Sequence, residues 1–304
     1  MTSPTILKVA AAQYPIGQPR SLSEWESKIA LWVKKGAATG ASLLVFPEYA
    51  AIEQAAAFGP EVYSDLQATL RKVAELAESR VALHCDLARK HGVHILAGSG
   101  PVLKTGGRFV NAAQLVTPEG CVGVQEKLVM TPFERDWGIS AGARVRVFRT
   151  AIGTFGIAIC YDSEFPLLVN AMAQAGADVV LVPSCTERIS GYHRVRTGCM
   201  ARALENTIAT IQSPTVGDAP WSPAVDFNAG AAGVYVPSEH GVSDTGVLAE
   251  GPLNEAAWVA AEIDMARLKR VRDSGEMRNA HDWTLQPGAP AAGVAVEVVD
   301  LKRA

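Results

Sequence analysis

Three apolar segments of the chain each end in one residue that can take part in covalent chemistry. Glu48 follows LLVFP, Lys127 follows CVGVQE, and Cys160 follows GIAI. A thiol can act as a nucleophile, a carboxylate can take its proton, and an ammonium group can stabilise a developing oxyanion. A charged residue at the end of a strand is ordinarily solvated, so each residue alone is weak support. Together they supply the groups needed for nucleophilic catalysis by cysteine.

The segment around Cys160, GTFGIAICYDSEFP, predicts a buried strand, a sharp turn and a helix. Phe155 and Ile157 alternate with small residues, and Pro166 suits the first turn of a helix. A nucleophile on such a turn is lifted clear of the sheet, with backbone N–H groups nearby to receive an oxyanion. A cysteine at the end of an apolar strand is more often a small core residue. The role of Cys160 therefore depends on what other segments bring to it.

A second carboxylate, Glu134, lies seven residues after Lys127 in KLVMTPFE. It could hold the ammonium group in place or contact a substrate, although a surface glutamate would show the same pattern. Because a lysine lowers the pKa of a neighbouring thiol, we expect a depressed pKa for Cys160. A carboxylate in a dry pocket holds its proton longer, so we expect Glu48 to titrate at a higher pH than usual.

Strands alternate with helices near both ends of the chain, with hairpin-like pairs between them, which favours a single α/β domain with a mixed sheet. The expected strands are 6–14, 41–46, 93–97, 109–117, 121–126, 153–159, 177–183, 207–212, 232–236 and 258–263. The expected helices are 21–35, a long helical region over 64–91 with room for one break, 166–172, 192–206 and 264–272.

The composition limits the class of protein. The 304 residues are 48% hydrophobic and 19% charged, enough for a sizeable core. A formal net charge of −3 gives no electrostatic reason to expect nucleic acid or an anionic membrane as a partner. We expect no membrane-spanning segment, because no apolar run reaches roughly 20 residues, and we see no signal peptide. The five cysteines lack a Cys-x-x-Cys pair, which favours a cytoplasmic protein without disulfides or zinc.

Five segments resemble, in order, blocks of the nitrilase or carbon–nitrogen hydrolase superfamily. FPEY (46–49), KLVMTPFE (127–134) and GIAICYDSEFP (156–166) resemble its catalytic blocks, and ADVVLVPS (177–184) and ARALENT (201–207) resemble structural blocks. The resemblance implies a four-layer α-β-β-α sandwich formed by a hydrolase domain over residues 1–278. Residues 279–304 are expected to form a C-terminal tail with apolar VAV and VV segments, packed on the same domain or on a partner subunit.

The resemblance also implies roles for individual residues. Cys160 is expected to be the nucleophile, Glu48 the general base and Lys127 the stabilising cation, with Glu134 as an auxiliary glutamate. The residues expected to contact substrate are Tyr49, Tyr161 (whose backbone N–H would face the oxyanion), Cys185 and Thr186. No metal or organic cofactor is implied, and a homodimer or larger homo-oligomer is expected.

The residues after the cysteine indicate the substrate class. Tyr161-Asp162 stands where the nitrile-cleaving members of the superfamily tend to have Trp-Glu. We therefore expect hydrolysis of a carboxamide-type C–N bond in a small molecule through a cysteine thioester, with release of ammonia or an amine. Hydrolysis of a nitrile or of an N-carbamoyl group, and an inactive binding protein with the same fold, are alternatives. Polar residues in 184–194, among them Glu187, Arg188 and Arg194, fit either an ionic substrate group or solvated charges.

Other patterns are weaker. His193, His240 or His281 could pair with Cys160 as in Cys–His proteases, but no motif places them near it. A second group, His84, Cys85, His91 and His94, is close in sequence but fits no standard zinc spacing. Gly98-Ser-Gly100 lacks the third glycine and the helix of a dinucleotide site. Cys85, Cys121 and Cys199 are expected to be core residues.

Overall fold

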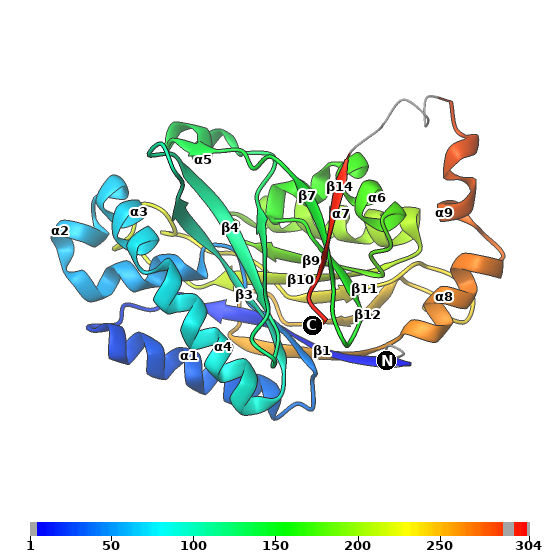
Figure 1. Ribbon diagram of the computed structural model, residues 1–304, viewed down its shortest axis with the longest axis horizontal. Helices are drawn as coiled ribbons and strands as arrows, with labels where there is room; N and C mark the ends of the chain where they lie inside the picture. Colours follow the sequence, from blue (N-terminus) through cyan, green and yellow to red (C-terminus); the bar gives the residue numbers. More distant parts are fainter. Residues whose placement is uncertain (1–4, 288–294, 303–304) are drawn as a thin grey trace.

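A computed structural model describes residues 5–287 and 295–302 of the chain. Its strands form one hydrogen-bonded sheet that divides into two halves stacked face to face, with helices on both outer sides (Figure 1). This is the four-layer α-β-β-α sandwich that the sequence predicts. The two halves pair with each other at the ends of two central strands, Tyr14 with Thr215 and Pro15 with Val216.

The first half of the sheet is centred on β1. Its strands, in spatial order, are β13 (Ala257–Asp264), β1 (Ile6–Pro15), β2 (Leu43–Val45), β3 (His94–Leu103), β4 (Phe109–Val116) and β5 (Val122–Glu126), with the short β6 (Ile139–Ser140) beside β4. Leu7 and Val9 of β1 face the core between the two halves, while Ala10 and Ala12 pack under the outer helices. Because both faces of β1 are covered, its sequence is apolar at almost every position.

The second half is the sheet that carries the segment before Cys160. Its strands, in order, are β14 (Val296–Asp300), β7 (Val145–Arg149), β8 (Thr154–Ile157), β9 (Val179–Ser184), β10 (Ala209–Val216), β11 (Gly233–Tyr235) and β12 (Val247–Glu250). Phe148, Phe155 and Leu181 from this half share one buried cluster with Leu7 and Val9 from the other. The core between the two halves therefore holds the sandwich together.

The helices form the two outer layers and the edges. One outer layer contains α1 (Leu22–Ala37), α3 (Leu66–Glu75) and α4 (Ala77–His91), and the other contains α6 (Pro166–Gln174) and α7 (Ile189–Asn206) (Figure 1). Shorter or peripheral helices are η1 (Ala50–Phe58), α2 (Pro60–Tyr63), α5 (Pro132–Asp136), η2 (Cys160–Glu164), α8 (Met265–Ser274), α9 (Asn279–Asp282) and η3 (Trp283–Leu285). Ser21 caps α1 by accepting the N–H of Glu24, as its capping pattern predicts.

The structure differs from the sequence prediction at several elements. The long helical region breaks once, at Leu76, and the Gly98–Gly100 segment lies inside β3. Strands β6, β7, β12 and β14 were not predicted. Val296–Asp300 pairs in parallel with β7 of the same chain, so this part of the tail completes the chain's own sheet. The rest of the predicted VAV segment, at residue 294, lies outside the described residues, and the domain boundary at residue 278 stays a prediction.

Candidate active site

Parallel strands bring the reactive residues together. Strands β2, β1, β10, β9 and β8 form a continuous parallel run across the junction between the two halves. Glu48 follows β2, Cys160 follows β8 and Cys185 follows β9, so all three lie beyond the carboxyl ends of these strands, where α/β sheets commonly bind ligands. Lys127 directly follows β5, which belongs to the first half of the sheet. The site therefore forms where the two halves meet.

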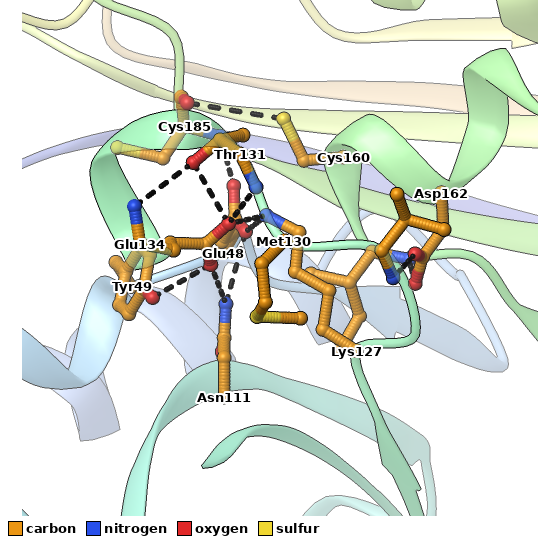
Figure 2. Close-up of polar contacts among 12 residues, drawn as sticks. Glu48, Tyr49, Asn111, Lys127, Met130, Thr131, Glu134, Cys160, Asp162 and Cys185 are labelled. Atoms are coloured by element: carbon orange, nitrogen blue, oxygen red, sulfur yellow. Dashed lines mark hydrogen bonds and ion pairs between the residues drawn. The ribbon is translucent and has the colours of Figure 1, made fainter. Parts of the chain in front are cut away.

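Lys127 is the centre of the polar cluster. Its Nζ lies 2.7 Å from Glu48 Oε1 and 2.7 Å from Glu134 Oε2, and its side chain is 1% exposed (Figure 2). Burial alone would lower the pKa of Lys127, but the two carboxylates raise it well above its usual value. The ammonium group is therefore charged and fixed between two anions, as a preorganised stabiliser of an oxyanion must be.

Glu134 is held by a helix start as well as by Lys127. Thr131 caps α5, and the Glu134 carboxylate accepts the Thr131 N–H and hydroxyl at 3.0 Å each. Tyr49 Oη also donates to Glu134 Oε1, at 2.8 Å. Burial raises the pKa of Glu134, but Lys127 and these hydrogen bonds outweigh it and lower the pKa below the usual value. The capping box in TPFE thus places an ionised glutamate beside the lysine.

The position of Glu48 depends on a glycine in the neighbouring strand. Gly98 has φ +78°, and a Cβ there would lie 2.3 Å from the carbonyl oxygen of Pro47. The absent side chain lets the Pro47–Glu48 backbone approach β3, where Ser99 N–H donates to Pro47 O and Ser99 Oγ accepts the Tyr49 N–H. Gly98 and Ser99 therefore serve the site by fixing the loop that carries Glu48.

Cys160 occupies the predicted turn, with one difference. Its backbone has φ +48°, a strained conformation for a residue with a side chain, and it begins η2 rather than leading straight into α6. Its Sγ lies 3.8 Å from the carbonyl oxygen of Cys185. Tyr161 is the second residue of η2, where a backbone N–H has no intrahelical acceptor. The turn thus presents a thiol and an N–H group together.

The expected depressed pKa of Cys160 is wrong. Burial raises the pKa of this thiol well above its usual value, and the negative charge of Glu48 adds to the effect, while Lys127 opposes it. Lys127 is already paired with two carboxylates, and its single positive charge cannot balance a thiolate as well. Burial also raises the pKa of Glu48, against the influence of Lys127, as the sequence predicts. The resting site therefore holds a neutral thiol next to a strengthened carboxylate base.

These groups line a pocket of about 420 Å³. Tyr49, Phe133 and Trp137 supply an aromatic side, and Tyr161, Cys185 and Thr186 also line it. All the residues expected to contact substrate are therefore at the pocket. The remaining charged lining residues are Glu164, Glu187, Arg188 and Arg194. Arg194 pairs with Glu164, with 3.3 Å between Nε and Oε1.

Two buried residues of the site were missed by the sequence analysis. Asn111, on β4, donates to both glutamates from one amide nitrogen. Asp162 accepts the N–H groups of Leu128, Val129 and Ile159, so it joins the loop after Lys127 to the turn of Cys160. A lone Asn in the apolar strand FVNAAQLV was a usable signal, because a buried polar side chain requires partners.

Other candidates take no part in the site. His193 and His281 are exposed and His240 lies away from the pocket lining, while His84 and His94 are buried, which lowers the pKa of each to about 4. Within the described residues no group of three or more His, Cys, Asp or Glu side chains could hold a metal ion. Cys199 is buried, whereas Cys85 and Cys121 are only partly buried. No helix in the described part of the chain is long and apolar enough to cross a membrane.

The α-β-β-α sandwich and the polar cluster at the junction of its halves agree with the resemblance to the carbon–nitrogen hydrolase family. The carbon-nitrogen hydrolase family model matches residues 8–273, and the chain belongs to this family.

Similar proteins support this assignment. The chain is 35% identical over 277 residues to "Probable hydrolase YhcX" of Bacillus subtilis (strain 168), covering 91% of this chain and 53% of that protein. The chain thus spans about half the length of this relative. It is 33% identical over 209 residues to an (R)-stereoselective amidase of Pseudomonas sp, covering 66% of this chain and 70% of that protein. The crystal structure of Nit3 of Saccharomyces cerevisiae, a member of branch 10 of the nitrilase superfamily, has the same fold, with a TM-score of 0.73, 20% identity and coverage of 90% and 97%.

Proposed function

We propose that the protein hydrolyses carboxamide-type C–N bonds of small molecules through a thioester on Cys160. The observation that carries the proposal is the convergence of Cys160, Glu48 and Lys127 in one pocket, with Glu134 holding the lysine. The amidase among the similar proteins supports the same chemistry.

In the first half of the reaction, Glu48 acts first as a general base and then as a general acid. As Cys160 Sγ attacks the carbonyl carbon, Glu48 takes the thiol proton, and the carbonyl oxygen becomes an oxyanion that Lys127 Nζ and the Tyr161 N–H stabilise. Glu48 then gives this proton to the substrate nitrogen. The C–N bond breaks, ammonia or an amine leaves, and the thioester remains. A neutral resting thiol fits this order, because the proton moves only when the substrate is in place.

In the second half, Glu48 takes a proton from water, and the hydroxide attacks the thioester carbon. Lys127 Nζ and the Tyr161 N–H stabilise the second oxyanion, and the C–S bond then breaks. The carboxylic acid product leaves and ionises, and Glu48 returns its proton to the Cys160 thiolate. No step requires an oxidant, a metal or a further reactant. The aromatic side of the pocket, with Tyr49 and Trp137, would receive the acyl chain.

The test presents one acyl group as amide, N-carbamoyl derivative, nitrile and ester, with hydroxylamine as a competing acceptor. We expect ammonia release to be fastest from the amide, and hydroxamate to form at the expense of the acid. Faster release from the nitrile would contradict the amide assignment. Hydroxamate without detectable hydrolysis would indicate a transferase instead. Absence of both products and of any acyl adduct on Cys160 by mass spectrometry would favour an inactive binding protein.

A further inference from the structure

Asn111 makes contacts that the proposed reaction does not yet use. It lies on β4 and is completely buried. Its Nδ2 lies 3.0 Å from Glu48 Oε1 and 3.1 Å from Glu134 Oε1, so its two N–H groups can serve one carboxylate each (Figure 2). Its backbone carbonyl also accepts the N–H of Lys127 at 2.8 Å. One residue therefore contacts all three charged members of the site.

The two oxygens of Glu48 differ because of these contacts. Oε1 accepts Lys127 Nζ at 2.7 Å and Asn111 Nδ2 at 3.0 Å. Oε2 accepts the Cys185 N–H at 3.0 Å, and the Cys160 thiol lies within hydrogen-bonding reach of the Glu48 carboxylate. A carboxylate oxygen has two lone pairs, so Oε1 is fully used and Oε2 retains one. The retained lone pair is on the oxygen next to Cys185, whose carbonyl lies against Cys160 Sγ.

An amide is suited to this position for a chemical reason. Two buried carboxylates repel each other, and a single lysine neutralises only one charge. The amide N–H groups stabilise both anions without adding charge, and they cannot exchange a proton with Glu48. A second lysine would lower the basicity of Glu48 further, while a water molecule could donate, accept and change places.

We propose that Asn111 is a positioning residue that makes Glu48 Oε2 the proton-accepting oxygen and keeps it directed at Cys160. This inference rests on the proposed function, since it concerns the base of that reaction. Asn111 acts by occupying Glu48 Oε1 and by holding Glu48 and Glu134 at a fixed separation. It does not touch the reacting atoms, and it is absent from the pocket lining.

Two substitutions separate this role from simple packing. Asn111→Leu keeps the size and removes the donors, so kcat should fall by about one to two orders of magnitude, less than for loss of the base itself. KM should change by less than about threefold, since Asn111 does not line the pocket. The acid side of the kcat/KM profile should move to higher pH, because Glu48 loses a hydrogen bond that stabilises its ionised form. Asn170→Leu is the matched control, since Asn170 is a buried amide that donates to Asn206 at 2.9 Å, away from the site.

Asn111→Asp supplies a readout that packing would not move. A protonated Asp side chain can donate one hydrogen bond to a neighbouring glutamate, whereas an ionised one adds a third anion. The kcat of Asn111→Asp relative to Asn111→Leu should therefore decrease steadily as pH rises. The rate at which iodoacetamide alkylates Cys160 can be measured by mass spectrometry in the absence of substrate. This rate should rank the variants in the same order as kcat does.

The outcomes are distinguishable. A folded Asn111→Leu protein with wild-type kcat and pH profile would overturn the inference while leaving the proposed function intact. If the ratio of the kcat of Asn111→Asp to that of Asn111→Leu did not change with pH, Asn111 would have only a structural role. If wild-type protein hydrolyses none of the amides, the proposed function fails, and the alkylation series alone then decides whether Asn111 governs the base. In that case, equal rates of Cys160 alkylation in wild type and Asn111→Leu would overturn the inference.

Discussion

Glu48 Oε2 accepts the backbone N–H of Cys185 at 3.0 Å, and the carbonyl oxygen of the same residue lies 3.8 Å from Cys160 Sγ. The main chain at Cys185 therefore contacts the proposed base and the proposed nucleophile at once. It follows β9, in the same parallel run as the strands that precede Glu48 and Cys160. The sheet itself thus sets the distance between base and thiol.

Because these contacts belong to the main chain, the Cys185 thiol should be dispensable. Burial and the charge of Glu48 raise the pKa of this thiol to about 12, so it stays neutral at physiological pH. Cys185→Ala should keep kcat within about threefold of wild type, whereas Cys160→Ala should abolish turnover at unchanged fold. Ammonia release and circular dichroism of both variants provide the measurement. An active Cys160→Ala protein would end the proposed mechanism, and an inactive, folded Cys185→Ala protein would assign its side chain a direct role.

Removal of the Lys127 charge should affect stability as well as rate. In Lys127→Met, two buried carboxylates lose their counterion, which should lower the free energy of unfolding by about 3–5 kcal/mol and kcat by at least about two orders of magnitude. The double variant Lys127→Met/Glu134→Gln removes one of the unpaired anions. It should regain much of the stability but not the rate. Urea unfolding and ammonia release report the two effects, and near-normal turnover in either variant would refute the role of Lys127 at the oxyanion.

The sequence predicts those parts of the structure that local residue patterns determine. The apolar runs of β1 and β2, the capping sequence of α1 and the turn at Cys160 each predict their own conformation, and five segments in order predict the sandwich. The missed strand β7, VRVFR, shows the alternation of apolar and charged residues that is typical of a strand, but over only five residues this pattern is too short to stand out in a single sequence.

The unpredicted part depended on residues far apart in the chain. Asn111 meets Glu48 across 63 positions, and no local spacing encodes that contact. The pKa of Cys160 was predicted in the wrong direction because the sequence places a lysine nearby but does not show that Glu48 and Glu134 already neutralise it. Burial and the sum of neighbouring charges are properties of the assembled site.

Asp162 should make stability depend on pH. Burial raises its pKa to about 7, against the three backbone N–H groups that favour its ionised form. An unfolded Asp has a pKa of about 3.9, so between about pH 4 and pH 7 the folded state binds more protons than the unfolded state. The contribution of Asp162 to the free energy of unfolding therefore falls as pH rises through this window. Asp162→Asn removes this dependence, so its stability relative to wild type should rise from pH 4.5 to pH 8 in urea unfolding. A constant difference between the two proteins across that range would mean that Asp162 is ionised throughout.

The outer face of α6 and α7 leads to a prediction about assembly. Leu167 on α6 and Leu204 on α7 are 46% and 42% exposed, so the helices that follow the nucleophile and β9 each present a large apolar side chain at the surface. We propose that two copies pair through this face in a two-fold arrangement, in which each side chain would be buried against the partner. The wild-type protein should therefore show at least a dimer mass by light scattering at micromolar concentration.

Single charged substitutions test this arrangement directly. Leu167→Glu and Leu204→Glu would each place two like-charged carboxylates at a two-fold interface, which should shift the mass toward the monomer. Leu31→Glu is the control, because Leu31 is 50% exposed on α1, in the opposite helical layer, and should leave the mass unchanged. The Cys160 turn begins η2, which is followed by α6, so we also expect a lower kcat in any variant that becomes monomeric. A monomeric wild type would refute the pairing, and a dimer unaffected by both substitutions would place the interface on another face.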